Sequence, residues 1–491
     1  MAATLLVLLA FAAPLKAQEL PHLERRGDAT QLIVDGRPFL ILGGELGNSS
    51  ASSREYMRPY WAKLRAMNLN TVLAPVSWEL IEPEERRFDF ASVDGLLEDA
   101  RAHDMRLVLL WFGTWKNSTS SYAPAWVKRD TARFQRTKGK DGRAQEIMSA
   151  FSKEARDADA RAFAALMRHL KAVDGDRHTV LMVQVENEVG FLPFAKEGGN
   201  GADLAADERA MASAYARYVE AVAAAGKREY PLPMYVNGAQ GRPSVVPGDY
   251  PSGGPLAHLA KEWRQGAPSI DFIAPDIYFP NFAGIADKYV ESGNPLFVPE
   301  ANRSSDARIG ANALRSIGHH DAIGFSPFAI EDAGEADAAR IAGLYEMLGG
   351  ISPLVLEAQS KGRIAGFANP VSFDGTVDEA ALVETFGPGL FTVTTIDPWT
   401  DRAKQDPSTH GAVLIWLGGE DYLLAGQGIT LTVEPADGRG RLGFDWVEEG
   451  HYADGQWVAG RRLNGDQTHQ GRHVRLPPGE FGMQRFRLYR Y

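Results

Sequence analysis

Short apolar runs alternate with longer stretches of helical period along most of the chain. From about residue 31 to residue 365, each run of β-branched and apolar residues is followed by polar positions and mostly by an amphipathic pattern. Such alternation is typical of βαβ units around a parallel sheet. Eight runs fit a (β/α)8 barrel better than a doubly wound sheet, which more often has about five to seven strands. The predicted strands are 39–44, 71–76, 107–112, 180–185, 233–237, 272–278, 296–300 and 322–328.

The same spacing predicts the helices. Apolar stripes that each face one side of a helix cover residues 57–67 and 160–170, and both stripes indicate packing against a core. An Ala-rich segment, 205–225, predicts a helix of the outer ring. Residues 336–348 predict the helix that closes the barrel.

The pattern changes from residue 367 onward. Short alternating strands such as 412–416 and 430–433 are separated there by Gly, Asp and Pro turns. This spacing is typical of an all-β domain, most simply a sandwich. We therefore predict a catalytic barrel over residues 18–365 and a β-sandwich accessory domain over residues 366–491.

The first residues predict a secretory signal peptide over residues 1–17. An apolar run over residues 4–13 is too short for a bilayer, which needs about twenty residues, and Ala17-Gln18 offers a small-residue cleavage site. A buried N-terminal helix is the alternative. Because no later segment holds about eighteen uninterrupted apolar residues, we expect a periplasmic or secreted protein that has no membrane contact after cleavage.

Composition narrows the chemistry. The 491 residues include 52 Lys and Arg against 63 Asp and Glu, a formal net charge of −11. This balance argues against a nucleic-acid partner, which a protein binds by neutralising phosphates. The absence of cysteine excludes thiol nucleophiles, disulfides, thiolate zinc sites and iron–sulfur clusters. Catalysis would have to use carboxylates, histidines, hydroxyls or amides.

Two glutamates follow predicted barrel strands, where reactive groups of such barrels gather. The strand 180–185 leads into Glu186-Asn187-Glu188, and the strand 296–300 ends at Glu300. Two carboxyl groups across a barrel mouth are what a glycosidase needs, because one protonates the leaving oxygen while the other attacks the anomeric carbon or activates water. The charge of one carboxylate raises the pKa of the other. This pair predicts glycoside hydrolysis.

The residues next to Glu188 differ in the side of the strand that they are expected to face. Asn187 could hold a sugar hydroxyl, but neighbouring strand residues face opposite sides. Asn187 and Glu188 therefore both reach the site only if the strand ends irregularly there. Glu186 shares its parity with Glu188, and for Glu186 we expect a hydrogen-bonding role in the layer beneath.

The segment 183–190, Val-Gln-Val-Glu-Asn-Glu-Val-Gly, resembles the Val-Gln-Val-Glu-Asn-Glu-Tyr-Gly motif of the family 35 glycoside hydrolases, which are mostly β-galactosidases of the retaining barrel clan. The resemblance implies that Glu188 is the acid/base, that Glu300 is the nucleophile and that Asn187 contacts the sugar 2-hydroxyl. Tyr278 matches the tyrosine of that clan that hydrogen-bonds the nucleophile. The resemblance implies neither a cofactor nor a metal.

Several positions depart from that family. Val189 replaces a Tyr, and Glu79 and Ile81 replace Asn and His in a segment that otherwise resembles Trp-Asn-x-His-Glu-Pro. Pro75 stands where a tyrosine is expected, and the loop 111–117 replaces a Cys/Ala-Glu loop. In the family these positions read the outer sugar hydroxyls. The mechanism therefore transfers better than the identity of the sugar.

Other side chains near the predicted mouth are candidates for substrate binding. Three tryptophans could stack on the apolar face of a sugar, with core packing as the alternative. They are Trp78, Trp111 and Trp115. Four polar groups beyond strands one to three could bind sugar hydroxyls, with solvated loop positions as the alternative. They are Glu45, Asn48, Glu79 and Asn117.

His319 and His320 could suggest a metal site. No third ligand accompanies them at a suitable spacing, and neighbouring side chains do not easily bind one ion together. We therefore expect loop or surface histidines at these positions and no metal.

The expected function is that of an exported retaining exo-β-glycosidase without a cofactor. The resemblance implies a β-galactosidase that releases terminal β-galactose from an oligo- or polysaccharide substrate. Another β-glycosidase, acting on β-glucosides or β-arabinosides, is the alternative within the enzyme class. A carbohydrate-binding protein on an inactivated barrel is the alternative outside it, although binding alone would not require both glutamates.

Overall fold

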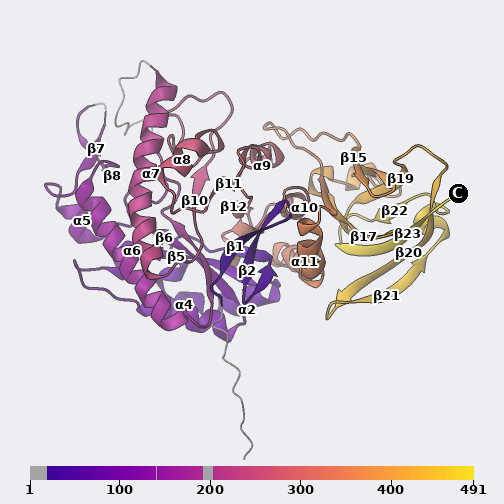
Figure 1. The fold of residues 1–491 in the computed structure, drawn as a ribbon, viewed down its shortest axis with the longest axis horizontal. Helices are drawn as coiled ribbons and strands as arrows, with labels where there is room; N and C mark the ends of the chain where they lie inside the picture. Colours follow the sequence, from indigo (N-terminus) through magenta and orange to yellow (C-terminus); the bar gives the residue numbers. More distant parts are fainter. Residues whose placement is uncertain (1–18, 140, 192–202) are drawn as a thin grey trace, which may run out of the picture.

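A computed structural model describes residues 19–139, 141–191 and 203–491. The predicted signal peptide, residues 1–17, lies outside the described residues. Figure 1 shows a barrel surrounded by helices beside a C-terminal domain made of strands, with α10 and α11 between the two. The predicted architecture, a barrel followed by an all-β domain, is confirmed.

Eight parallel strands close the barrel in the order β10-β11-β12-β13-β4-β5-β6-β9. Each strand overlaps one of the eight predicted runs. They are β4 (Ile41–Glu45), β5 (Thr71–Ser77), β6 (Arg106–Phe112), β9 (Val180–Val185), β10 (Met234–Ala239), β11 (Phe272–Ile277), β12 (Val298–Arg303) and β13 (Gly324–Phe328). Between β11 and β12, Asp276 lies opposite Glu300, so the register brings two carboxyls to one level at the ends of these strands.

Helices follow most of the barrel strands and cover the outside of the barrel. They are α1 (Arg54–Met57), α2 (Tyr60–Ala66), α3 (Trp78–Ile81), α4 (Ala91–Ala102), α5 (Ala125–Arg129), α6 (Lys153–Asp174), α7 (Leu204–Glu229), α8 (Ala260–Gly266), α9 (Phe282–Glu291), α10 (Ile309–His319) and α11 (Glu335–Ser360). Two of the three longest described helices, α6 and α7, begin at side-chain caps. Ser152 accepts a hydrogen bond from Ala155 N, and Asp203 accepts one from Ala206 N, which satisfies amides that the helix itself leaves unpaired.

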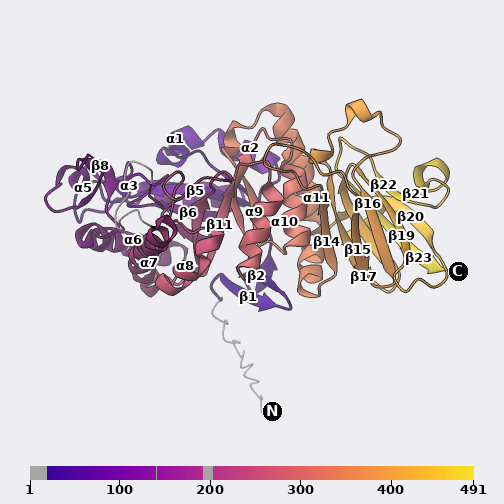
Figure 2. The same cartoon turned by 90° about the horizontal axis from the view of Figure 1, so that it is seen from above.

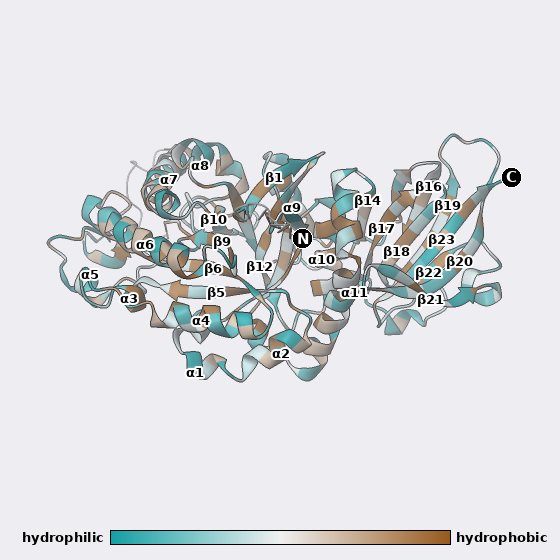
Figure 3. Ribbon diagram, turned by 60° about the horizontal axis from the view of Figure 1, so that its bottom comes forward, coloured by the Kyte–Doolittle hydropathy of each residue, from teal (hydrophilic) through white to brown (hydrophobic). Residues whose placement is uncertain are grey.

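The barrel interior is a packed core whose lower end is closed by a small sheet. This sheet consists of β1 (His22–Arg26), β2 (Ala29–Val34) and β3 (Arg37–Phe39). Leu32 and Val34 of β2 belong to one buried cluster with barrel residues that include Ile41, Leu110 and Phe297. Burying each such side chain stabilises the fold by roughly 1.5–3 kcal/mol. Figure 3 shows the resulting pattern, with hydrophobic strands inside and mixed helices outside.

The C-terminal domain packs two antiparallel sheets face to face. The larger sheet has the order β14-β17-β18-β23-β20-β21 and the smaller β15-β16-β19-β22. Phe391 and Leu431 of the smaller sheet and Leu424 and Phe486 of the larger sheet share one buried core. The strands are β14 (Ile364–Ala368), β15 (Leu382–Phe386), β16 (Gly389–Thr394), β17 (Gly411–Gly418), β18 (Asp421–Gln427), β19 (Ile429–Pro435), β20 (Leu442–Ala453), β21 (Gln456–Leu463), β22 (Val474–Leu476) and β23 (Gly482–Arg490).

Helices α10 and α11 join the two bodies, as the view in Figure 2 also shows. A Cβ on Gly366 of β14 would lie 2.5 Å from the Leu314 carbonyl oxygen of α10, so a glycine permits this close approach. In the described part of the chain, α11 alone is long and apolar enough to cross a membrane, but it lies between the barrel and the sandwich with half of its most apolar window buried. We therefore interpret α11 as a core helix.

Candidate active site

Glu188 and Glu300 meet at the barrel mouth. Glu188 follows β9 and Glu300 lies within β12, and both side chains are largely buried, at 8% and 4% exposed. Carboxylate oxygens of Glu188, Asp276 and Glu300 all lie within 4.8 Å of one another. The structure thus brings together the two glutamates that sequence reasoning selected and adds a third carboxyl that it did not.

The backbone after β9 is irregular, as the sequence predicts. Glu186 and Glu188 have positive φ angles of 63° and 45°, which only a minority of non-glycine residues adopt. Glu188 N donates to Asn237 Oδ1 at 3.1 Å, and Ser118 Oγ donates to the Glu188 carbonyl at 2.7 Å. These bonds hold the unfavourable turn, which costs roughly 1–3 kcal/mol for each such residue.

The electrostatics at Glu188 are those of a proton donor. Burial and the nearby Glu300 carboxylate together raise the pKa of Glu188 to about 7, against the opposing effect of Lys116. A carboxyl with this pKa is still partly protonated near neutral pH. Asn117 Nδ2 also donates to Glu188 Oε2, which fixes the orientation of the carboxyl.

Tyr278 holds Glu300 from the end of β11. Its hydroxyl donates to Glu300 Oε1. Burial of the hydroxyl and the nearby Glu300 carboxylate raise the pKa of Tyr278 well above its usual value, so the phenol stays protonated and remains a donor. A carboxylate that receives such a hydrogen bond is held in one orientation.

Two further carboxyls crowd the centre. Asp276 accepts from Asn237 Nδ2 at 2.6 Å, and Glu45 lies at the end of β4 with 1% of its surface exposed. Burial, followed by the charge of Glu300, raises the pKa of both carboxyls well above the usual range. Lys116 is the cation that opposes these shifts, and it is itself buried.

Several buried polar atoms at the centre lack a hydrogen-bond partner among the described residues. These atoms are both carboxyl oxygens of Glu45, Asn187 Nδ2, Asp276 Oδ1 and Glu300 Oε2. Buried polar atoms normally have partners, so this set of acceptors with one donor suits a ligand that carries hydroxyl groups. Asn187 is oriented by its Oδ1, which accepts from Asn117 N at 3.4 Å.

The expectation that Trp78, Trp111 and Trp115 form stacking platforms for a sugar is corrected. All three side chains have 0% of their surface exposed. Their indole N–H groups donate to Glu82, to Asp159 and to the Met148 carbonyl. The rings fill space between strands and helices, where a sugar does not reach.

Glu186 supports the loop beneath the site. Its carboxyl accepts from Trp115 N at 2.6 Å and from Thr114 N at 3.2 Å. Burial and the adjacent Asp159 raise the pKa of Glu186 well above its usual value. Gly113 permits this packing, because a Cβ there would lie 2.7 Å from Glu186 Oε1. These contacts agree with the expected role of Glu186 in the layer beneath.

Asn48 and Glu79 lie apart from the carboxyl cluster. Both line a hollow of about 230 Å³ beyond β4 and β5, together with Pro75 and Tyr122 among others. Glu79 also accepts from Lys128 Nζ at 3.3 Å. Neither Glu188 nor Glu300 lines this hollow.

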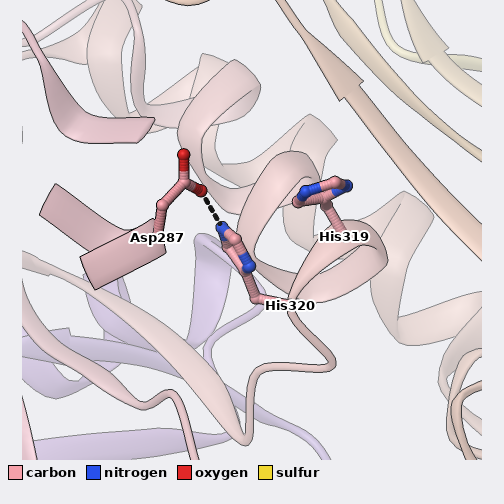
Figure 4. Close-up of side chains that lie close together, drawn as sticks. All are labelled: Asp287, His319 and His320. Atoms are coloured by element: carbon pink, nitrogen blue, oxygen red, sulfur yellow. Dashed lines mark ion pairs between the residues drawn. The ribbon is translucent and has the colours of Figure 1, made fainter. Parts of the chain in front are cut away.

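The two histidines have the third polar partner that sequence reasoning did not find. Figure 4 shows Asp287 of α9 facing His320, whose Nε2 lies 2.9 Å from Asp287 Oδ1. Ligand atoms of Asp287, His319 and His320 lie close enough to hold an ion. However, Arg315 donates to the same Asp287 oxygen at 3.2 Å, and a guanidinium so close opposes a cation.

Sequence reasoning missed Asp276, Asn237 and Lys116. Asp276 and Asn237 lie within barrel strands, in β11 and β10, so their place near the strand ends was the available signal. Lys116 lies in the loop 111–117 that departs from the family, and nothing in the sequence indicates that its side chain is buried beside the carboxyls.

Comparison with known proteins relates part of the chain to glycoside hydrolases. Residues 31–225 match the model of "Glycosyl hydrolases family 35", and residues 341–475 match a "Domain of unknown function (DUF5597)". A β-galactosidase of Xanthomonas manihotis is 30% identical over 200 residues, which cover 38% of this chain and 30% of that protein. The human β-galactosidase-1-like protein 3 is 43% identical over 58 residues, 12% of this chain and 9% of that protein. The chain therefore matches less than a third of either relative's length.

Solved structures resemble the chain more loosely. A β-galactosidase from Bacillus circulans sp. alkalophilus has a TM-score of 0.49 and 16% identity, covering 65% of this chain and 57% of that one. The catalytic domain of a β-amylase from Paenibacillus polymyxa has a TM-score of 0.47 and 10% identity, covering 60% of this chain and 94% of that one.

The family match includes Asn187 and Glu188 and ends before Tyr278 and Glu300. The second half of the site is therefore assigned from geometry. The matches support a glycoside hydrolase and confirm the expected resemblance: residues 31–225 of this chain match the model of the glycosyl hydrolases of family 35.

Proposed function

We propose that this protein is a retaining β-glycosidase that releases terminal β-galactose from oligo- or polysaccharides. The carrying observation is the pair Glu188 and Glu300, whose carboxylate oxygens lie within 4.8 Å of each other. Retaining glycosidases hold their two carboxyls about 5–5.5 Å apart, whereas inverting enzymes need about 6.5–9.5 Å to admit a water molecule.

The reaction runs in two displacements. Glu300 attacks the anomeric carbon while Glu188 gives its proton to the glycosidic oxygen, so the C–O bond to the leaving group breaks as the bond to Glu300 forms. Glu188, now a carboxylate, then takes a proton from water. That water attacks the anomeric carbon and releases Glu300 as a carboxylate. Two inversions give net retention.

Neighbouring residues have supporting roles. Tyr278 keeps Glu300 oriented through its hydrogen bond, and Asn187 presents a free amide N–H group toward the sugar. The unpaired oxygens of Glu45 and Asp276 are hydrogen-bonding partners for sugar hydroxyls. Since such hydrogen bonds reject analogues that lack the hydroxyl, these carboxyls would contribute to sugar specificity.

Galactose is the sugar that the curated relatives' names favour, and a panel of aryl β-glycosides tests it. We expect the galactoside to give the highest kcat/KM among galactosides, glucosides and arabinosides. A higher kcat/KM for a glucoside or an arabinoside would overturn the assignment of galactose. Binding of glycans without turnover of any of them would favour a carbohydrate-binding protein instead.

Export is a separate part of the proposal and rests on the apolar run over residues 4–13. Expression of the full chain in a bacterial host, followed by N-terminal sequencing of the periplasmic fraction, tests it. A mature protein that begins near Gln18 supports export. A cytoplasmic protein that keeps residues 1–17 contradicts it.

A further inference from the structure

A turn of the C-terminal domain reaches the loop that follows β11 at the barrel mouth. Residues 371–377, between β14 and β15, form a tight turn closed by Ser372 N, which donates to the Thr376 carbonyl at 2.8 Å. The Asp374 carboxylate accepts from Ser372 Oγ at 2.7 Å and from Thr376 N at 3.0 Å. These internal bonds give the turn a defined shape, and Phe373 lies within it.

Phe373 packs directly against the loop that carries the catalytic tyrosine. Its ring centroid lies 5.0 Å from that of Phe279, with an interplanar angle of 53°. Phe279 follows Tyr278 in the chain and is partly buried against the barrel core. Such an aromatic pair stabilises the contact beyond the effect of the area that it buries.

Tyr278 meets the site through a hydrogen bond and a ring contact. The residue lies just after β11 and is 39% exposed, yet its hydroxyl meets Glu300. On the barrel side its ring contacts Phe328 edge to face, with centroids 6.2 Å apart. A half-exposed side chain that must hold a hydrogen bond at a reacting carboxylate needs support on more than one side.

We propose that the C-terminal domain completes the catalytic centre, with Phe373 acting as a positioning residue that holds Tyr278 against Glu300 through Phe279. The proposal rests on the proposed function, because it takes Glu300 as the nucleophile. Residues 341–475 match a domain family of unknown function. The proposal gives the C-terminal domain a role in the catalytic reaction at the barrel mouth. The two domains would then work as one enzyme.

Phe373→Ala tests the proposal against a matched control, Phe481→Ala. Phe481 also belongs to the C-terminal domain and packs on the barrel, where its Cζ would lie 2.6 Å from a Cβ placed on Gly310 of α10. Both changes remove one phenylalanine from the junction, but only Phe373 adjoins the Tyr278 loop. We expect both variants to lose similar thermal stability.

Turnover should separate the two variants. With an aryl galactoside, kcat of Phe373→Ala should fall about tenfold to a hundredfold, as small misplacements of catalytic groups do, while Phe481→Ala keeps its kcat. Phe373→Tyr should restore most of the loss. In a Tyr278→Phe background, Phe373→Ala should cost little more, because the positioned hydroxyl is already gone. Equal kcat in the two single variants, or fully additive losses in the double variant, would overturn the proposal.

A crystal structure of Phe373→Ala provides a readout that needs no activity. The proposal predicts that Tyr278 no longer contacts Glu300, and an intact Tyr278–Glu300 hydrogen bond would overturn it. If the unmodified protein turned over no glycoside, the proposed function would fail. This structure would still decide whether Phe373 positions Tyr278.

Discussion

Carboxylate oxygens of Glu188 and Glu300 lie within 4.8 Å of one another across the mouth of the barrel. In the proposed mechanism this short spacing favours the second carboxylate as the nucleophile, because inverting enzymes hold their carboxyls about 6.5–9.5 Å apart to admit a water molecule. Burial, followed by the nearby Glu300 carboxylate, raises the pKa of Glu188, which suits Glu188 to the proposed role of proton donor.

Glu188→Gln should remove the proton donor and the basic limb of the pH profile. The pKa of Glu188 is raised to about 7, so the group loses its proton and the unmodified enzyme loses kcat/KM as the pH rises through that value. In the variant we expect kcat to be lower by about 10²–10⁴. Its kcat/KM should not decline as the pH rises through about 7, because the substituted glutamine has no proton to lose. Kinetics between about pH 5 and 9 check this, and a basic limb that persists in the variant would contradict the role of Glu188.

Tyr278→Phe should leave the fold intact and slow the reaction. The change removes the hydroxyl that donates to Glu300 Oε1, so the nucleophile loses its orientation. We expect kcat to fall by about tenfold to a hundredfold, with a melting temperature close to that of the unmodified protein. Tyr489→Phe, at an exposed site in the C-terminal domain, is the control. Unchanged kcat in Tyr278→Phe would refute the role.

Glu186→Ala should act on stability. It leaves the buried amide of Trp115 without an acceptor, which costs about 1–3 kcal/mol, whereas Thr114 N keeps Asp159 Oδ2 as its acceptor. Urea unfolding should show this loss, whereas Glu84→Ala, at an exposed ion pair with Arg87, should change little. A variant as stable as the control would disprove the supporting role.

The same residue should make stability depend on pH. The pKa of Glu186 is raised in the folded state, so the native protein keeps a proton that the unfolded chain releases. Its contribution to stability is therefore complete below the usual glutamate pKa and declines as the pH rises above that value. Glu186→Gln cannot ionise and should flatten this part of the stability profile. An unchanged slope in Glu186→Gln would contradict the shift.

Trp115→Ala should destabilise the protein. The ring is fully buried and contacts Tyr215 and Tyr218. Its removal leaves a cavity, which should lower the free energy of unfolding by about 3–5 kcal/mol. Trp399→Ala, at a ring that is 55% exposed, is the control and should cost far less. If Trp115→Ala kept its stability and only raised KM, the ring would be a sugar platform after all.

The barrel was predictable because its strands are short apolar runs whose alternation with helices has few architectural solutions. Glu188 and Glu300 were predictable for a related reason, since the strand ends of such a barrel converge on one mouth. The irregular turn at Glu188 also followed from side-chain parity, and the positive φ angles there agree with it.

Burial was less predictable. The sequence alone does not distinguish a tryptophan that lines a mouth from one that fills the layer beneath, and Trp111 belongs to the second kind. Long-range contacts were also inaccessible, because Asp287 lies about thirty residues before His320 and on a different helix. Phe373 is the clearest case, since nothing in its own segment indicates that it contacts the barrel mouth.

Covalent trapping tests the central claim most directly. A 2-deoxy-2-fluoro galactoside with a good leaving group slows the second displacement, so a retaining enzyme accumulates the glycosyl-enzyme intermediate. Proteolysis and mass spectrometry should locate one added fluorosugar on Glu300, and the Glu300→Gln variant should take up none. Labelling of Glu45, Glu188 or Asp276 instead, the other carboxyls of this centre, would contradict the account.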